Sequence, residues 1–285
     1  MITFDQIGDL GRLGNQMFQY AALRGIAAYH GYEWIVPPEG GWTYDNYGLF
    51  ECFTMPEGNE HQQVGLEFFT YTAHKFEFDK DYFESFPDNA NMEGYFQTEK
   101  YFKHIESTIR NEYTFRPEVL EVATAFRDSI DHDKLIALHV RRGDPNLVGN
   151  RGELWSYEML PDHHPVCQPE YYLEALEHFP SDTKVLVVSD VIDWCVTQPW
   201  LQGDRFYFSD FSLDTFEDGA AIPNIDLCLM TLCSDNIIAN SSLSWWGAWL
   251  NPNPDKVVIA PKRWFGSAYD HYNMSDLRPK SWIQI

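Results

Sequence analysis

Two neighbouring arginines stand directly behind an apolar segment in the second half of the chain. Residues 135–140 form the apolar run, and Arg141, Arg142, Gly143 and Asp144 follow it. A guanidinium carries N–H donors in a fixed fork that matches phosphate oxygens, so Arg141 is suited to bind a diphosphate. The alternative for the two arginines is an ion pair with Asp144 that closes a turn.

Two further polar segments follow apolar runs in the same way. Ser189 and Asp190 come after residues 185–188, and residues 240–244, Asn-Ser-Ser-Leu-Ser, come after residues 237–239. Free backbone N–H groups and the positive dipole end at the start of a helix favour phosphate, and serine hydroxyls add donors. Asp190 is suited to accept hydrogen bonds from a guanine edge or a ribose. An ordinary N-cap is the alternative for the serine run.

A loop near the N-terminus contains three glycines, Gly8, Gly11 and Gly14. Their spacing is not that of the Gly-x-Gly-x-x-Gly dinucleotide fingerprint, which we therefore reject. A glycine loop before a helix still admits a close ligand, and we expect it to direct Arg12 and Asn15 into a cleft between two domains. A simple tight turn is the alternative.

Several acidic and histidine-containing segments could suggest a metal. Residues 131–133 and 79–81 match an Asp-x-Asp pattern that binds a divalent cation with a diphosphate in many enzymes. The first lies before its strand, and neither adjoins a clear apolar strand end, so both are better explained as solvated loop carboxylates. His163 and His164 beside Cys167 have no second cluster to complete a ligand set. The sequence predicts no metal.

Composition limits the partners and the location. The chain has 285 residues and a formal net charge of −23, which disfavours nucleic acid or an anionic membrane as the main partner. The five cysteines include no Cys-x-x-Cys pair, which favours a reducing compartment. No leader and no apolar run of about 18 residues is visible. We expect a cytoplasmic protein without a transmembrane segment, with peripheral attachment to the inner face of the membrane as an option.

The pattern of apolar runs predicts an α/β fold with two domains. The first opens with a strand (2–7), the glycine loop, a helix from residue 15 and a strand (33–36), but residues 40–110 give no clear pattern. In the second half, strands and helices alternate as in a doubly wound parallel sheet, with the boundary at residue 130, giving domains 1–130 and 131–285. The last helix is expected to pack back on the first domain. The expected strands are 135–140, 185–188, 206–208, 237–239 and 257–260, and the expected helices are 117–130, 170–179, 225–233 and 243–250.

Three tryptophans follow the serine run. Trp245 and Trp249 fall on one helical face, with Trp246 offset. Core packing is the ordinary role of such side chains, and stacking on a sugar is the alternative.

Four segments together resemble the motifs of the α-1,2-fucosyltransferases of glycosyltransferase family 11. Shorter segments at 94–97 (GYFQ), 99–102 (EKYF) and 259–262 (IAPK) are similar to further family segments, and the resemblance spans nearly the whole chain. The four motifs are Gly11 to Ala21 (GRLGNQMFQYA), His139 to Asp144 (HVRRGD), Ser189-Asp190 with Trp194, and Asn240 to Leu250 (NSSLSWWGAWL).

The resemblance implies a GT-B fold, with two Rossmann-like domains and a cleft between them. It implies metal-independent transfer of L-fucose from GDP-β-L-fucose, with inversion, to the 2-hydroxyl of a terminal galactose on a glycan. GDP-fucose and a galactose-terminated oligosaccharide or polysaccharide are thus the expected partners, with the first domain on the acceptor side. The expected catalytic residues are Arg141, Arg12 and Asn15, and the expected donor-binding residues are His139, Arg142, Asp144, Asp190, Asn240, Ser241, Ser242, Ser244 and Gly14.

Two positions depart from the family pattern. The family commonly has glycine at the position of Arg12, and an acidic residue at the position of Val191, which puts the nucleoside contacts in question. The base for the acceptor hydroxyl is open between Asp144 and a donor phosphate oxygen. The alternatives for the function are a fucosyltransferase of another acceptor or linkage, and a non-catalytic GDP-sugar or glycan-binding protein.

Overall fold

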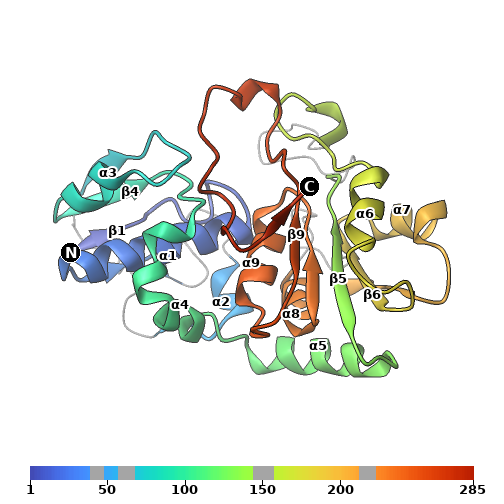
Figure 1. The fold of residues 1–285 in the computed structure, drawn as a ribbon. Coiled ribbons are helices and arrows are strands. Elements are labelled where there is room, and N and C mark those ends of the chain that lie inside the picture. Colours follow the sequence, from blue (N-terminus) through green and yellow to red (C-terminus); the bar gives the residue numbers. More distant parts are fainter. Residues whose placement is uncertain (39–47, 57–67, 144–156, 212–222) are drawn as a thin grey trace. The chain divides into compact units, whose positions relative to one another are not determined.

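The computed structural model describes residues 1–38, 48–56, 68–143, 157–211 and 223–285. The chain divides into two compact units (Figure 1). Unit 1 is Met1–Arg116 with Tyr272–Pro279, and unit 2 is Pro117–His271 with Lys280–Ile285. The sequence placed the boundary after the helix that ends near residue 130, whereas the structure groups this helix with unit 2. None of the described helices is long and apolar enough to cross a membrane.

Unit 1 is built on a parallel sheet of four short strands in the order β2-β1-β4-β3. Its strands are β1 (Ile2–Thr3), β2 (Trp34–Ile35), β3 (Phe69–Thr72) and β4 (Ala90–Glu93), and its helices are α1 (Leu13–His30), α2 (Leu49–Cys52), α3 (Lys80–Ser85) and α4 (Glu106–Glu112). The described part of the unit also has the 3-10 turns η1 (Glu99–Tyr101) and η2 (Lys103–Ile105).

The long helix α1 organises this unit. It is buried along most of its length from Leu13 to Ala27, and it ends at Gly31, whose φ of 72° lies in the left-handed region that glycine adopts freely. A Cβ atom on Gly25 would stand 1.9 Å from the carbonyl oxygen of Tyr101. The absence of a side chain at Gly25 therefore lets the end of η1 and the following Phe102 lie directly against α1.

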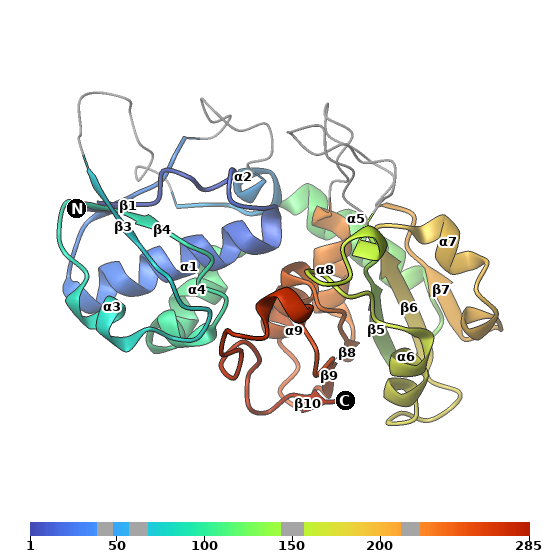
Figure 2. The same cartoon turned by 90° about the horizontal axis from the view of Figure 1, so that it is seen from above.

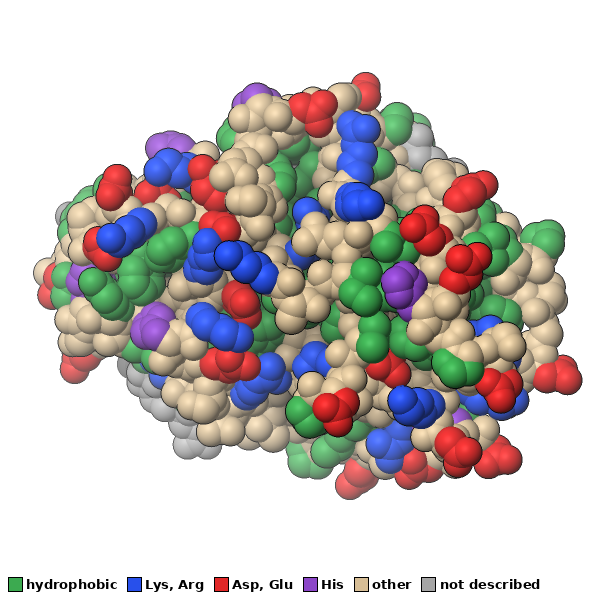
Figure 3. Space-filling view, viewed as in Figure 1, with side chains coloured by type: hydrophobic (Ala, Val, Ile, Leu, Met, Phe, Trp, Pro, Cys, Tyr) green, Lys and Arg blue, Asp and Glu red, His purple; other side chains and the backbone are tan. Residues whose placement is uncertain are grey.

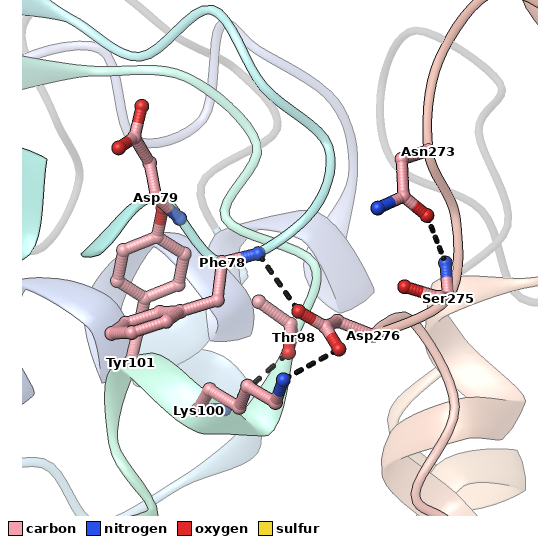
Figure 4. Close-up of polar contacts among 8 residues, drawn as sticks. All are labelled: Phe78, Asp79, Thr98, Lys100, Tyr101, Asn273, Ser275 and Asp276. Carbon is pink, nitrogen blue, oxygen red and sulfur yellow. Dashed lines mark hydrogen bonds and ion pairs between the residues drawn. The ribbon is translucent and has the colours of Figure 1, made fainter. Parts of the chain in front are cut away.

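The segment Tyr272–Pro279, which we call the strap, is the part of the C-terminal sequence that belongs to unit 1. Figure 4 shows its anchor: the carboxylate of Asp276 accepts from Lys100 Nζ at 2.6 Å and from the backbone N–H of Phe78 at 3.3 Å. The strap contains no helix, and no α-helix follows residue 250, so the expectation of a last helix packing on the first domain was wrong. Short polar residues and Pro279 favour turns in this stretch.

We expect Asp276→Ala to weaken unit 1, because it removes an ion pair and leaves the Phe78 N–H without its acceptor. The cost should be about 1 to 2 kcal/mol in the free energy of unfolding. Hydrogen exchange should quicken at residues 76–79 and 272–279. The control is Asp270→Ala, whose partner Arg263 lies 3.9 Å away with both side chains mostly exposed; an equal loss in the control would contradict the strap's role as an anchor.

Unit 2 is a parallel sheet of six strands in the order β10-β9-β8-β5-β6-β7. The doubly wound α/β prediction is confirmed, although β10 was not foreseen. The strands are β5 (Leu135–Val140), β6 (Lys184–Ser189), β7 (Phe206–Phe208), β8 (Asp235–Ile237), β9 (Val258–Ala260) and β10 (Ile283–Gln284), and the helices are α5 (Pro117–Ser129), α6 (Pro169–Leu176), α7 (Ile192–Val196), α8 (Asn224–Leu232) and α9 (Ser242–Leu250).

Helices cover both faces of this sheet, as Figure 2 shows with the strands between α6 and α8. Alternate residues of β5, namely Ile136, Leu138 and Val140, pack in one core with residues of α6 and α7. On the other side α8 packs against α5 and α9. Since both faces are covered, β5, β6 and β9 are nearly continuous apolar runs, and that pattern made them recognisable in the sequence. β8 begins with the buried polar residues Asp235 and Asn236, so it lies two residues earlier than the expected strand 237–239.

The tryptophans of α9 belong to the core of unit 2. Trp245 and Trp246 are fully buried and Trp249 nearly so. Trp245 lies against Trp249 and against Trp282 of the C-terminal segment, with ring centroids 6.2 Å and 5.4 Å apart. The structure therefore supports the core-packing alternative over sugar stacking.

Candidate functional site

Three polar segments meet at one edge of the unit 2 sheet. β5 lies between β8 and β6, and all three strands run parallel, so the residues that follow them leave the sheet at the same edge. The chain adds β6 and β7 on one side of β5, and β8, β9 and β10 on the other. The order thus reverses between β5 and β8, and this is where open α/β sheets bind ligands. The predicted gathering of the three segments is confirmed.

Arg141 is held at this edge by a carboxylate from the neighbouring strand. Its Nη1 lies 2.8 Å from Oδ2 of Asp190, and Asp190 is mostly buried. The backbone N–H groups of Arg142 and Gly143 donate to the same carboxylate at 3.2 Å and 2.8 Å. Gly143 has a φ of 76°, a left-handed conformation that favours glycine. The partner of Arg141 is therefore Asp190; Asp144, the partner in our alternative reading, lies outside the described residues.

This arrangement gives Asp190 a role that the sequence did not reveal. We expected its carboxylate to meet a nucleoside, whereas in the structure both oxygens accept from the Arg141-Arg142-Gly143 turn. A carboxylate with three donors fixes the position of the turn. Asp190 is thus placed to orient Arg141.

Arg141 keeps its charge although its side chain is largely buried. Burial opposes the charge, but Asp190 and Tyr157 outweigh it and raise the pKa of the guanidinium. The Nε of Arg141 is buried and has no hydrogen-bond partner among the described residues. A buried cationic N–H without an acceptor is unfavourable unless a ligand supplies one.

Two aromatic side chains beside Arg141 were not identified from the sequence as site residues. The guanidinium carbon lies 5.1 Å from the ring centre of Tyr157, and the His164 ring stacks on Tyr157 at 4.8 Å. Burial, Arg141 and His163 lower the pKa of His164 to about 4, so His164 is neutral near neutral pH. Only contacts across the fold reveal this pair, since neither residue lies at a strand end.

Arg142 and His139 have different surroundings from Arg141. The guanidinium of Arg142 lies 3.9 Å from the ring centre of Trp194 in α7. His139 is buried in β5, and burial lowers its pKa to about 4, with Asp190 raising and Arg141 lowering it. Its Nδ1 has no partner among the described residues. The structure thus gives Arg142 a stacking partner and leaves His139 neutral.

Asn240 and Ser244 are occupied by internal hydrogen bonds. Asn240 Nδ2 donates to the carbonyl oxygens of Pro165 at 2.7 Å and Trp264 at 3.0 Å. Ser244 is fully buried, and its hydroxyl donates to backbone carbonyls of its own segment at 3.3 and 3.4 Å. Through these contacts both side chains brace the loop between β8 and α9.

Ser241 and Ser242 lie at the start of α9. Ser241 is the N-cap of α9, yet its side chain makes no capping hydrogen bond, and both serines are only partly buried. The hydroxyls and the first-turn N–H groups together present donors at the positive end of a nine-residue helix. An anion is the natural partner of such a group.

A buried acid also lies near this edge. Asp226, in the first turn of α8, accepts a hydrogen bond from Ser209, which follows β7, and both are buried. Burial raises the pKa of Asp226 to about 7; the Ser209 bond opposes the shift, and the negative charges of Asp210 and Asp190 add to it. This group cannot be recognised from the sequence, because an acid in the first turn of a helix is ordinarily exposed.

The glycine loop of unit 1 holds the remaining predicted residues. Gly14 lies buried in the first turn of α1, Arg12 is the N-cap residue, and Asn15 is partly exposed. Asn15 Oδ1 accepts a hydrogen bond from Gln97 Nε2 at 2.7 Å. Gly11 has a φ of 98°, so the loop needs glycine there.

The family model "Glycosyl transferase family 11" matches residues 3–285. The chain belongs to glycosyltransferase family 11. Alpha-1,2-colitosyltransferase of Escherichia coli is 28% identical over 96% of this chain and 96% of that protein. Galactoside alpha-(1,2)-fucosyltransferase 2 of Hylobates lar is 24% identical over 89% of this chain and 71% of that protein.

Solved structures confirm the fold of this family 11 protein. Fucosyltransferase NodZ from Bradyrhizobium has a TM-score of 0.55 at 14% identity, covering 86% of this chain and 91% of that chain. NodZ alpha-1,6-fucosyltransferase co-crystallised with GDP gives a TM-score of 0.54 at 14% identity, covering 86% of this chain and 90% of that chain. Each unit is an α/β fold built on a parallel sheet, and the solved structures that it resembles are fucosyltransferases, so the GT-B prediction is confirmed.

The segments that resembled metal motifs have other partners in this family 11 chain. Asp79 caps α3 by accepting from the N–H of Tyr82 at 3.2 Å and pairs with Lys75 at 2.9 Å. His164 stacks on Tyr157. Among the described residues no group of three or more His, Cys, Asp and Glu side chains gathers in a way that could hold a metal ion.

Proposed function

We propose that this chain transfers L-fucose from GDP-β-L-fucose to the 2-hydroxyl of a terminal galactose on a glycan, with inversion at the fucose C1 and without a metal ion. The observation that carries the proposal is the edge between β5 and β8. There Arg141 follows β5 and has a buried Nε with no hydrogen-bond partner among the described residues. The neighbouring strand β8 leads to the start of α9, where Ser241 makes no side-chain capping bond. These donors suit the diphosphate of a nucleotide sugar.

Because the protein is strongly acidic overall, a diphosphate must be bound by a local group of hydrogen-bond donors. The chain carries a net charge of −23, and Figure 3 shows acidic and basic side chains intermingled on one face of the molecule. A doubly charged diphosphate therefore gains little from the surface as a whole. It gains from groups that are fixed in place and poorly hydrated, as Arg141 is.

Charge development at the leaving group explains how these groups would speed the reaction. The acceptor oxygen bonds to fucose C1 while the bond from C1 to the phosphate oxygen breaks, and that electron pair stays on GDP. The hydroxyl proton passes to a base, which we leave unassigned. Arg141 and the donors at Ser241 and Ser242 stabilise the charge that grows on GDP. We further propose that Arg12 and Asn15 act on the bound donor.

The relatives support the donor and the linkage. One relative is an alpha-1,2-colitosyltransferase, another is a galactoside alpha-(1,2)-fucosyltransferase, and NodZ was co-crystallised with GDP. The colitosyltransferase, matched over 96% of both chains, favours a colitosyl nucleotide as the second candidate donor.

The decisive experiment offers GDP-fucose and a colitosyl nucleotide to a panel of galactose-terminated acceptors, with and without EDTA. GDP release is followed, and the product linkage is determined. We expect EDTA-resistant transfer of fucose to the galactose 2-hydroxyl. Preference for the colitosyl nucleotide would replace the donor, a different linkage would replace the acceptor position, and GDP-fucose binding without transfer or hydrolysis would favour a receptor.

A further inference from the structure

The side chain of Asn15 is held by a residue distant in the sequence. Gln97, which follows β4, donates from Nε2 to Asn15 Oδ1 at 2.7 Å, and it is only 7% exposed. The backbone turns sharply just before it: Phe96 has a φ of 52°, and the N–H of Thr98 donates to the Phe96 carbonyl at 2.7 Å. This turn aims the Gln97 side chain at the glycine loop.

The other end of the Asn15 amide lies over Gly11. A Cβ on Gly11 would stand 2.2 Å from Asn15 Nδ2, so the amide occupies the space that any other residue would need. If the amide were reversed, Nε2 of Gln97 would face Nδ2, and two donors would meet. The contact with Gln97 therefore couples the orientations of the two amides: with Nε2 of Gln97 facing Oδ1, Nδ2 of Asn15 lies beside the glycine loop.

Stability alone does not account for a glutamine at position 97. Its Oε1 is buried and has no hydrogen-bond partner among the described residues. A buried amide carbonyl without a partner is unfavourable, and methionine would fill a similar volume without that penalty. A residue that breaks a local rule in this way is expected at a functional site.

The segment that carries Gln97 is itself firmly placed. Gln19 of α1 donates to the carbonyl of Gly94 at 3.4 Å, and Lys100 pairs with Asp276 of the strap, as Figure 4 shows. The Tyr101 carbonyl lies against Gly25 of α1. Gln97 thus projects from a support fixed on both sides, which is what a positioning residue requires.

We propose that Gln97 is a positioning residue that fixes the amide of Asn15, so that Nδ2 remains the group that donates to an oxygen of the bound nucleotide sugar. The proposal rests on the proposed function, in which Asn15 acts on the donor. Gln97 itself touches no substrate; it acts by keeping one rotamer and one orientation of Asn15 populated.

The first test compares Gln97→Met with Asn91→Leu. Asn91 is also 7% exposed and also hydrogen-bonded within unit 1, to the N–H of Asp5, so it controls for loss of a buried amide. We expect Gln97→Met to lower kcat by about 10-fold with the donor KM changed less than about 2-fold. Asn91→Leu should lower the Tm and leave kcat within about 2-fold of the wild type.

The second test asks whether Gln97 acts through Asn15. Asn15→Ala with Gln97→Met should be no slower than Asn15→Ala alone, because the group that Gln97 orients is already missing. Gln97→Glu should be slower than Gln97→Met, since a carboxylate attracts Nδ2 and reverses the amide. Additive losses, or wild-type kcat in Gln97→Met, would overturn the proposal.

The third test needs glycine variants. Gly11→Ala should displace the Asn15 side chain and reproduce the loss of kcat in Gln97→Met. Gly31→Ala is the matched control: its φ of 72° is also left-handed, but nothing lies within 4 Å of the added Cβ. Equal kcat in the two glycine variants would contradict the role of the Gly11 contact.

A measurement that does not depend on turnover distinguishes failure of this proposal from failure of the proposed function. The side-chain NH2 of Asn15 gives a pair of NMR resonances, expected to shift in Gln97→Met and to stay in place in Asn91→Leu. An unmoved pair in Gln97→Met overturns the proposal whatever the enzyme does. If the pair shifts but the wild-type protein does not transfer fucose, the proposed function is overturned, and so is the role of Nδ2 as a donor to the nucleotide sugar. Only the contact between Gln97 and Asn15 would then stand.

Discussion

Arg141→Ala is expected to lower kcat for fucose transfer by about 100-fold or more, the usual effect of removing one donor that faces developing charge. In the structure the Arg141 side chain pairs with Asp190, and its buried Nε has no partner within the part of the chain that the structure describes. Charge accumulates on the departing GDP chiefly in the transition state. Both kcat and kcat/KM should therefore fall, with a smaller change in donor affinity.

The variant should fold, because Asp190 keeps two partners when Arg141 is removed, the backbone N–H groups of Arg142 and Gly143. Tm values and GDP binding by calorimetry check this. Arg141→Lys keeps a charge but loses the fork, and should recover only part of the rate. Arg205→Ala is the control, since Arg205 donates to the Ser181 carbonyl, away from the Arg141 turn. Arg141→Ala with wild-type transfer would refute the proposed mechanism.

Asp190→Asn tests the orienting role of the carboxylate. Asparagine keeps the shape but offers one oxygen where two accept now, so Arg141 should lose its fixed position. We expect an intermediate loss of kcat, between the wild type and Arg141→Ala. A larger loss than in Arg141→Ala would indicate that Asp190 also contacts the nucleoside, as the sequence first suggested.

The sequence predicted the edge of the unit 2 sheet well, for a physical reason. Strands covered on both faces are runs of apolar residues, and the polar residue that ends each run marks the sheet edge. That logic located Arg141, Asp190 and Ser241. It could not separate residues that meet a ligand from those that brace the loop: the Asn240 amide is used by the carbonyls of Pro165 and Trp264, contacts that only the folded chain reveals.

Unit 1 was harder to predict because its order comes from contacts between distant segments. Its strands are two to four residues long, too short for a period to show. The segment around Gln97 takes its place from α1, through Gln19 and the close approach at Gly25, and from the strap, through Asp276. Each of these contacts joins residues more than 70 positions apart. Local propensity carries no information on such pairs.

The stability of the protein is expected to fall as the pH rises from about 4 to about 7, through Asp226. Burial raises the pKa of this carboxyl to about 7 in the folded protein, whereas an unfolded chain has a pKa near the ordinary 3.8. The folded state therefore binds the proton more tightly, so its advantage is complete below the unfolded pKa and is lost as the pH passes the folded pKa. A difference of about three pKa units corresponds to about 4 kcal/mol.

Asp226→Asn should remove this pH dependence, because the amide stays neutral and its oxygen still accepts from Ser209. The free energy of unfolding, measured with denaturant at several values from about pH 4 to about pH 8, should favour the variant increasingly up to about pH 7 and then by a constant amount. Ser209→Ala is the companion variant. The Ser209 hydroxyl stabilises the charged form of Asp226, so its loss should raise the folded-state pKa of Asp226 further. The pH range over which stability falls should then extend to higher pH. Parallel curves for wild type and Asp226→Asn would show that Asp226 ionises as an ordinary carboxyl, and that water or bound ligand reaches the start of α8.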